Sequence, residues 1–165
     1  MLWKPATIPK PTWRPGMSRT TVIRTIDAPI EEVFDTVAHI DNFAKAVRHI
    51  VATEFLSEVK SGVGARFRET RRMRGRETTT ELEVTEYVKN DRVRMVADAG
   101  GTVWDTLFEV APDSDRVKLT VSMDARAYRL MPRLVNPFIK GFVQKAIEAD
   151  MDAVQAYCEE ATGSS

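Results

Sequence analysis

Hydrophobic and polar residues alternate through the middle of the chain, over residues 50–127. The alternation is clearest near the end of this region, where hydrophobic residues from Val117 to Ala125 take every second position. A period of two predicts β-strands with one buried and one solvated face. Breaks that contain glycine, proline, asparagine or aspartate separate the expected strands, which are 50–57, 65–73, 77–87, 92–98, 102–111 and 116–127. Because the links are short, the strands should form an antiparallel meander.

A strand and two short helices are expected before this region, and one long helix after it. A first strand is expected over residues 19–26, and Asp27 and Pro29 then favour a helix start, with Asp27 as a possible cap. The helix has one apolar face, formed by Ile30, Val33, Phe34 and Val37. A second short helix is expected over residues 41–47. Hydrophobic residues then recur at three-to-four spacing from about residue 132 to 160, which predicts one long C-terminal helix.

The order of elements is therefore one strand, two short helices, six strands and one long helix, which predicts an α+β fold. A sheet with one apolar face must be covered by a second layer, and only the C-terminal helix is long enough to do so. We expect a seven-stranded antiparallel sheet with this helix across it and the short helices closing one end.

Composition and charge narrow the classes of function. Lys plus Arg number 24 and Asp plus Glu number 24, so the balance argues against a general nucleic-acid binder. Cys158 is the single cysteine, no apolar run reaches membrane-spanning length, and the start of the chain lacks the apolar stretch of a signal peptide, so we expect a cytoplasmic protein. Residues 1–17 contain four prolines and two tryptophans and are expected to form a separate tail, residues 18–161 a single domain, and residues 162–165 a frayed end.

Several local motifs resemble a known family. The junction from Ile26 to Phe34 (IDAPIEEVF), the Asp41-Asn42-Phe43 segment, the Gly62-Val63-Gly64 turn and the strand from Trp104 to Glu109 are similar to the START-like or Bet v 1-like superfamily (SRPBCC). The branch that they resemble most is that of polyketide cyclase/dehydrase and lipid-transport proteins, over residues 19–160. This resemblance implies a helix-grip fold, in which a curved sheet wraps around the C-terminal helix and encloses a hydrophobic cavity. It also implies a ligand such as a sterol, lipid, polyketide, plant hormone or quinone, bound with or without turnover.

The inward positions of the strands and the first half of the long helix are the expected cavity wall. The candidate residues are Phe67, Glu69, Arg71, Thr80, Leu82, Val84, Met95, Trp104, Phe108, Val121, Met123, Phe138 and Phe142. Aromatic and methionine side chains suit an adaptable apolar pocket, although the same side chains would also serve to fill a core. Alternation places Glu69 and Arg71 on the face of Phe67, where they would pair and orient a polar group of the ligand. If the strand end projects beyond the helix, both are solvated instead.

Other polar residues are weaker candidates for a catalytic or binding role. His39 and His49 flank the second short helix and are candidates for an acid or base, but they are better explained as loop residues, and they make no convincing metal site. Cys158 is expected to be structural. Six arginines lie between Arg66 and Arg76 and form a basic patch, which carboxylates on neighbouring strands can neutralise.

Three functions are compatible with these features. The leading hypothesis is binding of a small hydrophobic or amphipathic molecule, without turnover, metal or cofactor. The first alternative is a metal-free cyclase/dehydrase-like enzyme that uses Glu69, Arg71 and Trp104 in the same cavity. The second is a protein-interaction module that uses the tail and the arginine-rich hairpin. The partner is therefore expected to be a small molecule, with no stable membrane insertion, and both a monomer and a homodimer remain open.

Overall fold

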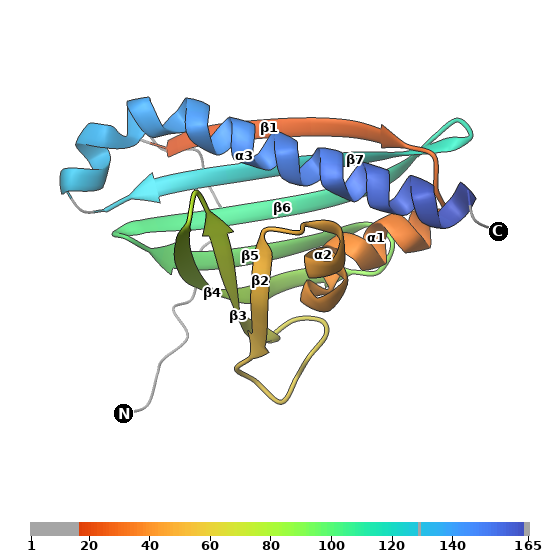
Figure 1. Ribbon diagram of the computed structural model, residues 1–165, viewed down its shortest axis with the longest axis horizontal. Coiled ribbons are helices and arrows are strands. Elements are labelled where there is room, and N and C mark those ends of the chain that lie inside the picture. The colour runs from red at the N-terminus through yellow and green to blue at the C-terminus, as the bar shows by residue number, and fades with distance from the viewer. Residues whose placement is uncertain (1–16, 129, 164–165) are drawn as a thin grey trace.

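Seven strands form one antiparallel sheet in the computed structural model, which describes residues 17–128 and 130–163, with side chains over 18–128 and 140–163 (Figure 1). The strand order is β1-β7-β6-β5-β4-β3-β2, as expected for a meander whose first strand pairs with its last. The strands are β1 (Met17–Ile26), β2 (Ile50–Phe55), β3 (Arg66–Met73), β4 (Arg76–Val88), β5 (Arg92–Ala99), β6 (Thr102–Asp113) and β7 (Arg116–Ala127).

Three helices complete the fold in the order predicted: α1 (Ile30–Ala38), α2 (Ile40–Ala46) and α3 (Leu130–Gly163). The expected cap on α1 is wrong, because Pro29 occupies the capping position and no side chain caps the helix. The backbone N–H of Asp27 instead donates to Glu159 of α3 at 3.1 Å. Val33, Phe34 and Val37 are buried, so the apolar face predicted for α1 does face the core.

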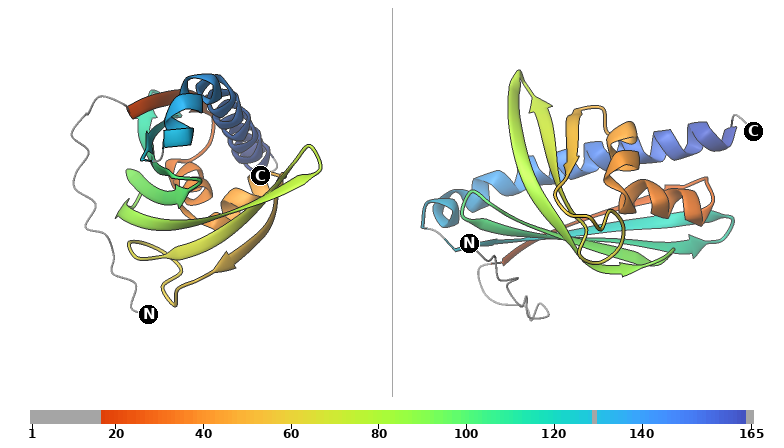
Figure 2. Two further views of the ribbon diagram at one scale, coloured as in Figure 1. Left: turned by 90° about the vertical axis from the view of Figure 1, so that its left-hand side faces the viewer. Right: turned by 90° about the horizontal axis from the view of Figure 1, so that it is seen from below.

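The sheet is strongly curved, and α3 crosses its concave side beside β1 (Figures 1 and 2). The short helices α1 and α2 lie at one end of this concave space and contact each other and α3. This arrangement is the predicted helix-grip fold. Within the described residues, no helix is long and apolar enough to cross a membrane. Residues 1–16 of the expected tail and residues 164–165 lie outside the described part of the chain.

Strand register determines which side chains share the concave face. Arg74 and Gly75 both have positive φ, of 50° and 76°, which suits a two-residue turn between β3 and β4. The pairing that follows places Phe67 opposite Leu82 and Glu69 opposite Thr80. Farther across the concave face, two rows of paired residues run from β5 through β6 to β7. These rows are Met95–Thr106–Met123 and Val93–Phe108–Val121.

Candidate functional site

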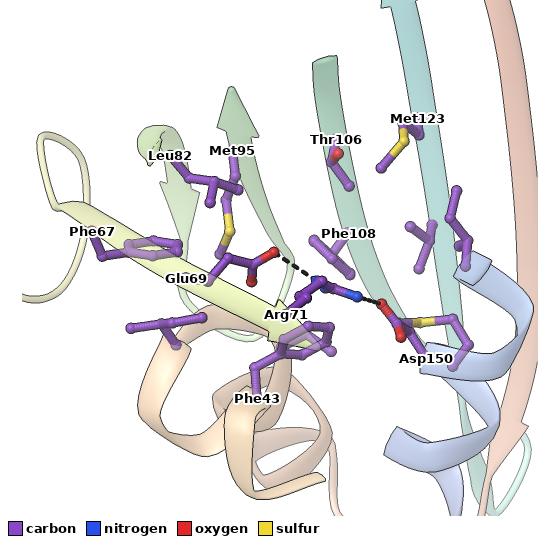
Figure 3. Close-up of a pocket in the computed structure, with 15 residues that line it drawn as sticks. Phe43, Phe67, Glu69, Arg71, Leu82, Met95, Thr106, Phe108, Met123 and Asp150 are labelled. Atoms are coloured by element: carbon purple, nitrogen blue, oxygen red, sulfur yellow. Dashed lines mark hydrogen bonds and ion pairs between the residues drawn. The ribbon is translucent and has the colours of Figure 1, made fainter. Parts of the chain in front are cut away.

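A cavity of about 110 Å³ lies between the concave face of the sheet, α1, α2 and the second half of α3 (Figure 3). Fifteen residues line it. Eight of them are among the thirteen predicted from the sequence: Phe67, Glu69, Arg71, Leu82, Met95, Phe108, Val121 and Met123. The remaining seven are Val37, Ile40, Phe43, Thr106, Ile147, Asp150 and Met151. The eight predicted residues all lie on strands, and the seven others come from the helices except for Thr106, which lies on β6.

The other predicted residues lie elsewhere. Val84 is buried in the core at 2% exposure, and Thr80 lies opposite Glu69 but does not line the cavity. Trp104 lines a much smaller hollow beside Thr20 and Lys140, and its indole N–H donates to the carbonyl oxygen of Ala99 at 3.4 Å. The side chain of Phe138 lies outside the described residues.

The inward placement predicted for Phe142 is wrong, because this residue is 55% exposed. The buried stripe of α3 runs through Ile147, Met151, Val154 and Cys158, at spacings of four, three and four residues. Continuing that stripe toward the start of the helix leads to Val143, which is half-buried, and not to Phe142. One residue of helix corresponds to a turn of about 100°, and that turn is enough to carry Phe142 out of the interface.

A charged cluster forms one side of the otherwise apolar cavity (Figure 3). Nε of Arg71 donates to Oε1 of Glu69 at 2.7 Å, and Nη1 of Arg71 donates to Oδ2 of Asp150 at 2.7 Å. Glu69 and Asp150 are 8% and 7% exposed. The pair predicted from alternation on β3 therefore faces the cavity, and its third member comes from α3, far along the chain.

Burial and pairing act in opposite directions on Arg71. Desolvation disfavours its charge, but the carboxylates of Asp150 and Glu69 outweigh this effect and raise the pKa of Arg71 above its ordinary value. The guanidinium therefore stays charged between its two partners. Its side chain is 24% exposed, so the cluster extends from the cavity to the solvent.

His49 completes the cluster at its solvent side, with its side chain 34% exposed. Nε2 of this ring lies 3.1 Å from Nη1 of Arg71 and 3.1 Å from Oδ1 of Asp150. An arginine nitrogen can only donate, so the contact with Arg71 is favourable when Nε2 is an unprotonated acceptor. His49 is thus the histidine that reaches the cluster, whereas His39 lies 3.6 Å from Asp35 and beside Tyr87.

Sequence reasoning missed Asp150, although the sequence around this residue could have identified it. It lies among Ile147, Met151 and Val154, so a carboxylate interrupts the apolar stripe of a helix. A carboxylate in a buried stripe requires a cation or hydrogen-bond donors. Its partner could not be identified from spacing, because Arg71 lies 79 residues earlier in the chain.

The remaining candidates have structural surroundings. Cys158 is fully buried with its sulfur 3.5 Å from Oγ1 of Thr36, and burial raises the pKa of the Cys158 thiol. In the arginine-rich hairpin, Arg68 pairs with Glu54 and Glu81, and Arg72 pairs with Glu77. Much of the basic patch is therefore neutralised across strands. Among the described residues, no group of three or more His, Cys, Asp or Glu side chains is placed to hold a metal ion.

Comparisons with known proteins agree with this architecture. A family model described as polyketide cyclase/dehydrase and lipid transport matches residues 17–159. A search of curated proteins by sequence finds no match. Among solved structures, the Zhui aromatase/cyclase from Streptomyces sp. R1128 is 18% identical, with a TM-score of 0.73 over 88% of this chain and 96% of that chain.

Two further structures show the breadth of the fold. The di-domain ARO/CYC StfQ from the steffimycin biosynthetic pathway is 11% identical with a TM-score of 0.75, and the match covers 89% of this chain and 52% of that chain. TTHA0849 from Thermus thermophilus is 14% identical with a TM-score of 0.72, over 87% of this chain and 99% of that chain. At such identities, these similarities establish the fold alone.

Proposed function

Because the chain belongs to the polyketide cyclase/dehydrase and lipid-transport family, we propose that it binds a small hydrophobic or amphipathic molecule between the sheet and α3. The observation that carries this proposal is the cavity, whose wall is mostly apolar and whose polar groups are gathered on one side. Apolar burial would provide the affinity for a lipid, polyketide or quinone-like ligand, and the charged cluster would orient it.

The size of the cavity limits what it can enclose. An engineered cavity of about 150 Å³ binds benzene, whereas pockets for drug-sized ligands measure about 300–1,000 Å³. At about 110 Å³, the cavity is smaller than both, so it would enclose at most one small ring or a short chain, and the rest of a larger ligand would extend past the partly exposed Arg71 and His49.

Filling the cavity tests this proposal. Leu82→Trp should reduce the affinity for toluene at least about tenfold, because the larger side chain takes the space of the ring. Isothermal titration calorimetry on both proteins would measure this change. Val88→Trp is the matched control, because Val88 lies on the same strand, is 39% exposed and does not line the cavity. If the unaltered protein took up no toluene, the lining residues would be a filled core and the proposal would be wrong.

The charged cluster favours a second candidate, a metal-free cyclase-like enzyme. Glu69 and His49 would exchange protons with a bound chain, and Arg71 would stabilise negative charge on an enolate oxygen. Trp104 has no part in this version, because it does not line the cavity.

Glu69→Gln distinguishes the enzyme from the binding protein. If Glu69 moves a proton, cyclisation of a synthetic polyketide chain should slow by about 100-fold or more, while the affinity for toluene changes little. Product formation followed by chromatography, with calorimetry in parallel, measures both quantities. Equal rates for the two proteins would remove Glu69 from the mechanism.

A cytoplasmic location and a small-molecule partner belong to the same proposal. The interaction-module alternative remains a prediction, because residues 1–16 of the tail lie outside the described residues. In its other element, the hairpin between β3 and β4, Arg68 and Arg72 are engaged in ion pairs with carboxylates of the same sheet. These pairs reduce the positive charge that the hairpin offers to an acidic partner.

A further inference from the structure

The tip of the hairpin between β3 and β4 lies apart from the rest of the sheet. Figure 2 shows that this hairpin projects past α3. Met73 and Arg76 are the last residues that pair across it, and Arg74 and Gly75 form the turn that joins the strands. All four residues are exposed, and none of them lines the cavity. The hairpin tip, residues 73–76, is therefore a surface feature that the core does not require.

The hairpin tip carries two positive charges that its surroundings do not neutralise. At the base of the tip, Arg72 pairs with Glu77 across the strands. Arg74 and Arg76 take part in none of the ion pairs formed among the described residues. Exposed cations attract anionic groups, and each arginine near an anionic membrane strengthens attachment about fivefold. The tip thus retains the positive charge that the ion pairs remove from the rest of the hairpin.

An exposed methionine lies between these cations. Met73 is 40% exposed and is paired directly with Arg76, so the two side chains share one face of the hairpin. Arg74 follows Met73 in the turn. A methionine among arginines suits a bilayer surface, because the apolar group can enter the headgroup region while the cations stay beside the phosphates.

One face of β3 connects the cavity to the hairpin tip. Side chains two positions apart on a strand share a face, so Phe67, Glu69, Arg71 and Met73 lie in one row. The first three line the cavity, and Arg71 lies at its partly exposed side. Met73 follows about 7 Å beyond Arg71 along the strand. An apolar molecule that left a bilayer at Met73 would therefore be close to the opening of the cavity.

We propose that the hairpin tip docks on the surface of an anionic lipid bilayer. Arg74 and Arg76 contact lipid phosphates, and Met73 enters the headgroup region between them. The docking stands on the hairpin alone, whereas its purpose, the exchange of an apolar ligand between bilayer and cavity, rests on the proposed function. A bilayer fits this tip better than an acidic protein does, because a stable protein interface buries about 800 Å² on each partner and a two-residue turn offers far less.

Co-sedimentation with lipid vesicles tests the docking. At low salt, the unaltered protein should bind vesicles of equal parts phosphatidylcholine and phosphatidylglycerol at least about tenfold more strongly than vesicles of phosphatidylcholine alone. Arg74→Gln combined with Arg76→Gln should weaken binding to the anionic vesicles about tenfold or more, because both cations that face the phosphates are lost. If the unaltered protein does not bind the anionic vesicles, the inference is wrong.

Lys89→Gln combined with Arg116→Gln is the matched control. Both side chains are exposed at turns, where Lys89 follows the other end of β4 and Arg116 begins β7. The variant therefore loses the same charge from a different part of the sheet. It should bind the anionic vesicles within about twofold of the unaltered protein. Equal losses in the two double variants would mean that total charge, and not the hairpin tip, governs binding.

Met73→Ser distinguishes insertion from attraction between charges alone. It should weaken binding to the anionic vesicles about threefold or more, because less apolar surface leaves the water. Val88→Ser should have no such effect, since Val88 is 39% exposed and ends the neighbouring strand at the opposite end of β4. An unchanged affinity of Met73→Ser would overturn the insertion of the tip.

Two further measurements separate this inference from its alternatives. All of these variants should bind toluene as the unaltered protein does, because none of the altered residues lines the cavity. Toluene binding without vesicle binding would overturn the inference and leave the proposed function standing. Binding of poly-L-glutamate that depends on Arg74 and Arg76, without binding to vesicles, would assign the tip to an acidic protein and overturn the docking on a bilayer.

Discussion

Replacing Arg71 with methionine should lower the free energy of unfolding by about 3 kcal/mol. Methionine retains much of the aliphatic length of arginine but removes the guanidinium that holds Glu69 and Asp150. The side chains of Glu69 and Asp150 are only 11% and 10% exposed, and they would be left as anions without this cation. The expected cost lies at the lower end of the range for breaking a buried ion pair, because the side chain of Arg71 is 24% exposed and water could partly replace it.

Urea unfolding at neutral pH measures this loss. Arg72→Met is the matched control, since Arg72 is the next residue on β3 but pairs with Glu77 at the surface, where both side chains are at least 50% exposed. The control should cost less than about 1 kcal/mol. Equal costs for the two variants would mean that the cluster is solvated.

The strands were the most predictable part of this molecule. The period of two and the turn residues predicted the six strands from residue 50 onward, and all seven expected strands have ends within about two residues of those in the structure. In the hairpin between β3 and β4, Arg74 and Gly75 both adopt positive φ, which glycine permits at the second position. A shift of one residue would have exposed Phe67 and buried Arg68, so register followed from the requirement to bury one face.

The cavity was predictable on the sheet side and much less so on the helix side. Alternation gives two choices for a strand residue, whereas a helix residue can point in any direction around the axis. A broad apolar stripe therefore left the rotation of α3 undetermined, and Phe142 was placed inward while Asp150 was overlooked. Alternation also could not say where β3 leaves the cover of the helix, which happens between Arg71 and Met73, since Met73 is 40% exposed.

The cluster has consequences for how the fold and the ligand site are connected. Arg71 joins β3 to α3, two of the elements that enclose the cavity, through its bond to Asp150, while its bond to Glu69 stays within β3. The same contacts that hold the helix over the sheet thus present polar atoms to the cavity.

Truncating Phe34 to alanine should cost about 3–5 kcal/mol in the free energy of unfolding. Phe34 is 1% exposed on α1 and packs edge-on against Tyr87, with ring centroids 5.4 Å apart and planes at 72°. Removing its ring loses the transfer free energy of the buried atoms and leaves a cavity that a closely packed core can only partly close. Urea unfolding should show a lower midpoint with an unchanged slope.

Phe142→Ala is the matched control, because the same ring is removed from a position that is 55% exposed. Its expected cost is within about 0.5 kcal/mol, since little apolar surface leaves the water there on folding. The sequence pattern predicted that both phenylalanines are buried. Phe142 differs because the rotation of α3 about its axis turns this residue to the solvent. A cost for Phe142→Ala close to that of Phe34→Ala would therefore mean that α3 presents Phe142 to the sheet. Asp150, eight residues further along the helix, would then no longer be the residue that contacts Arg71.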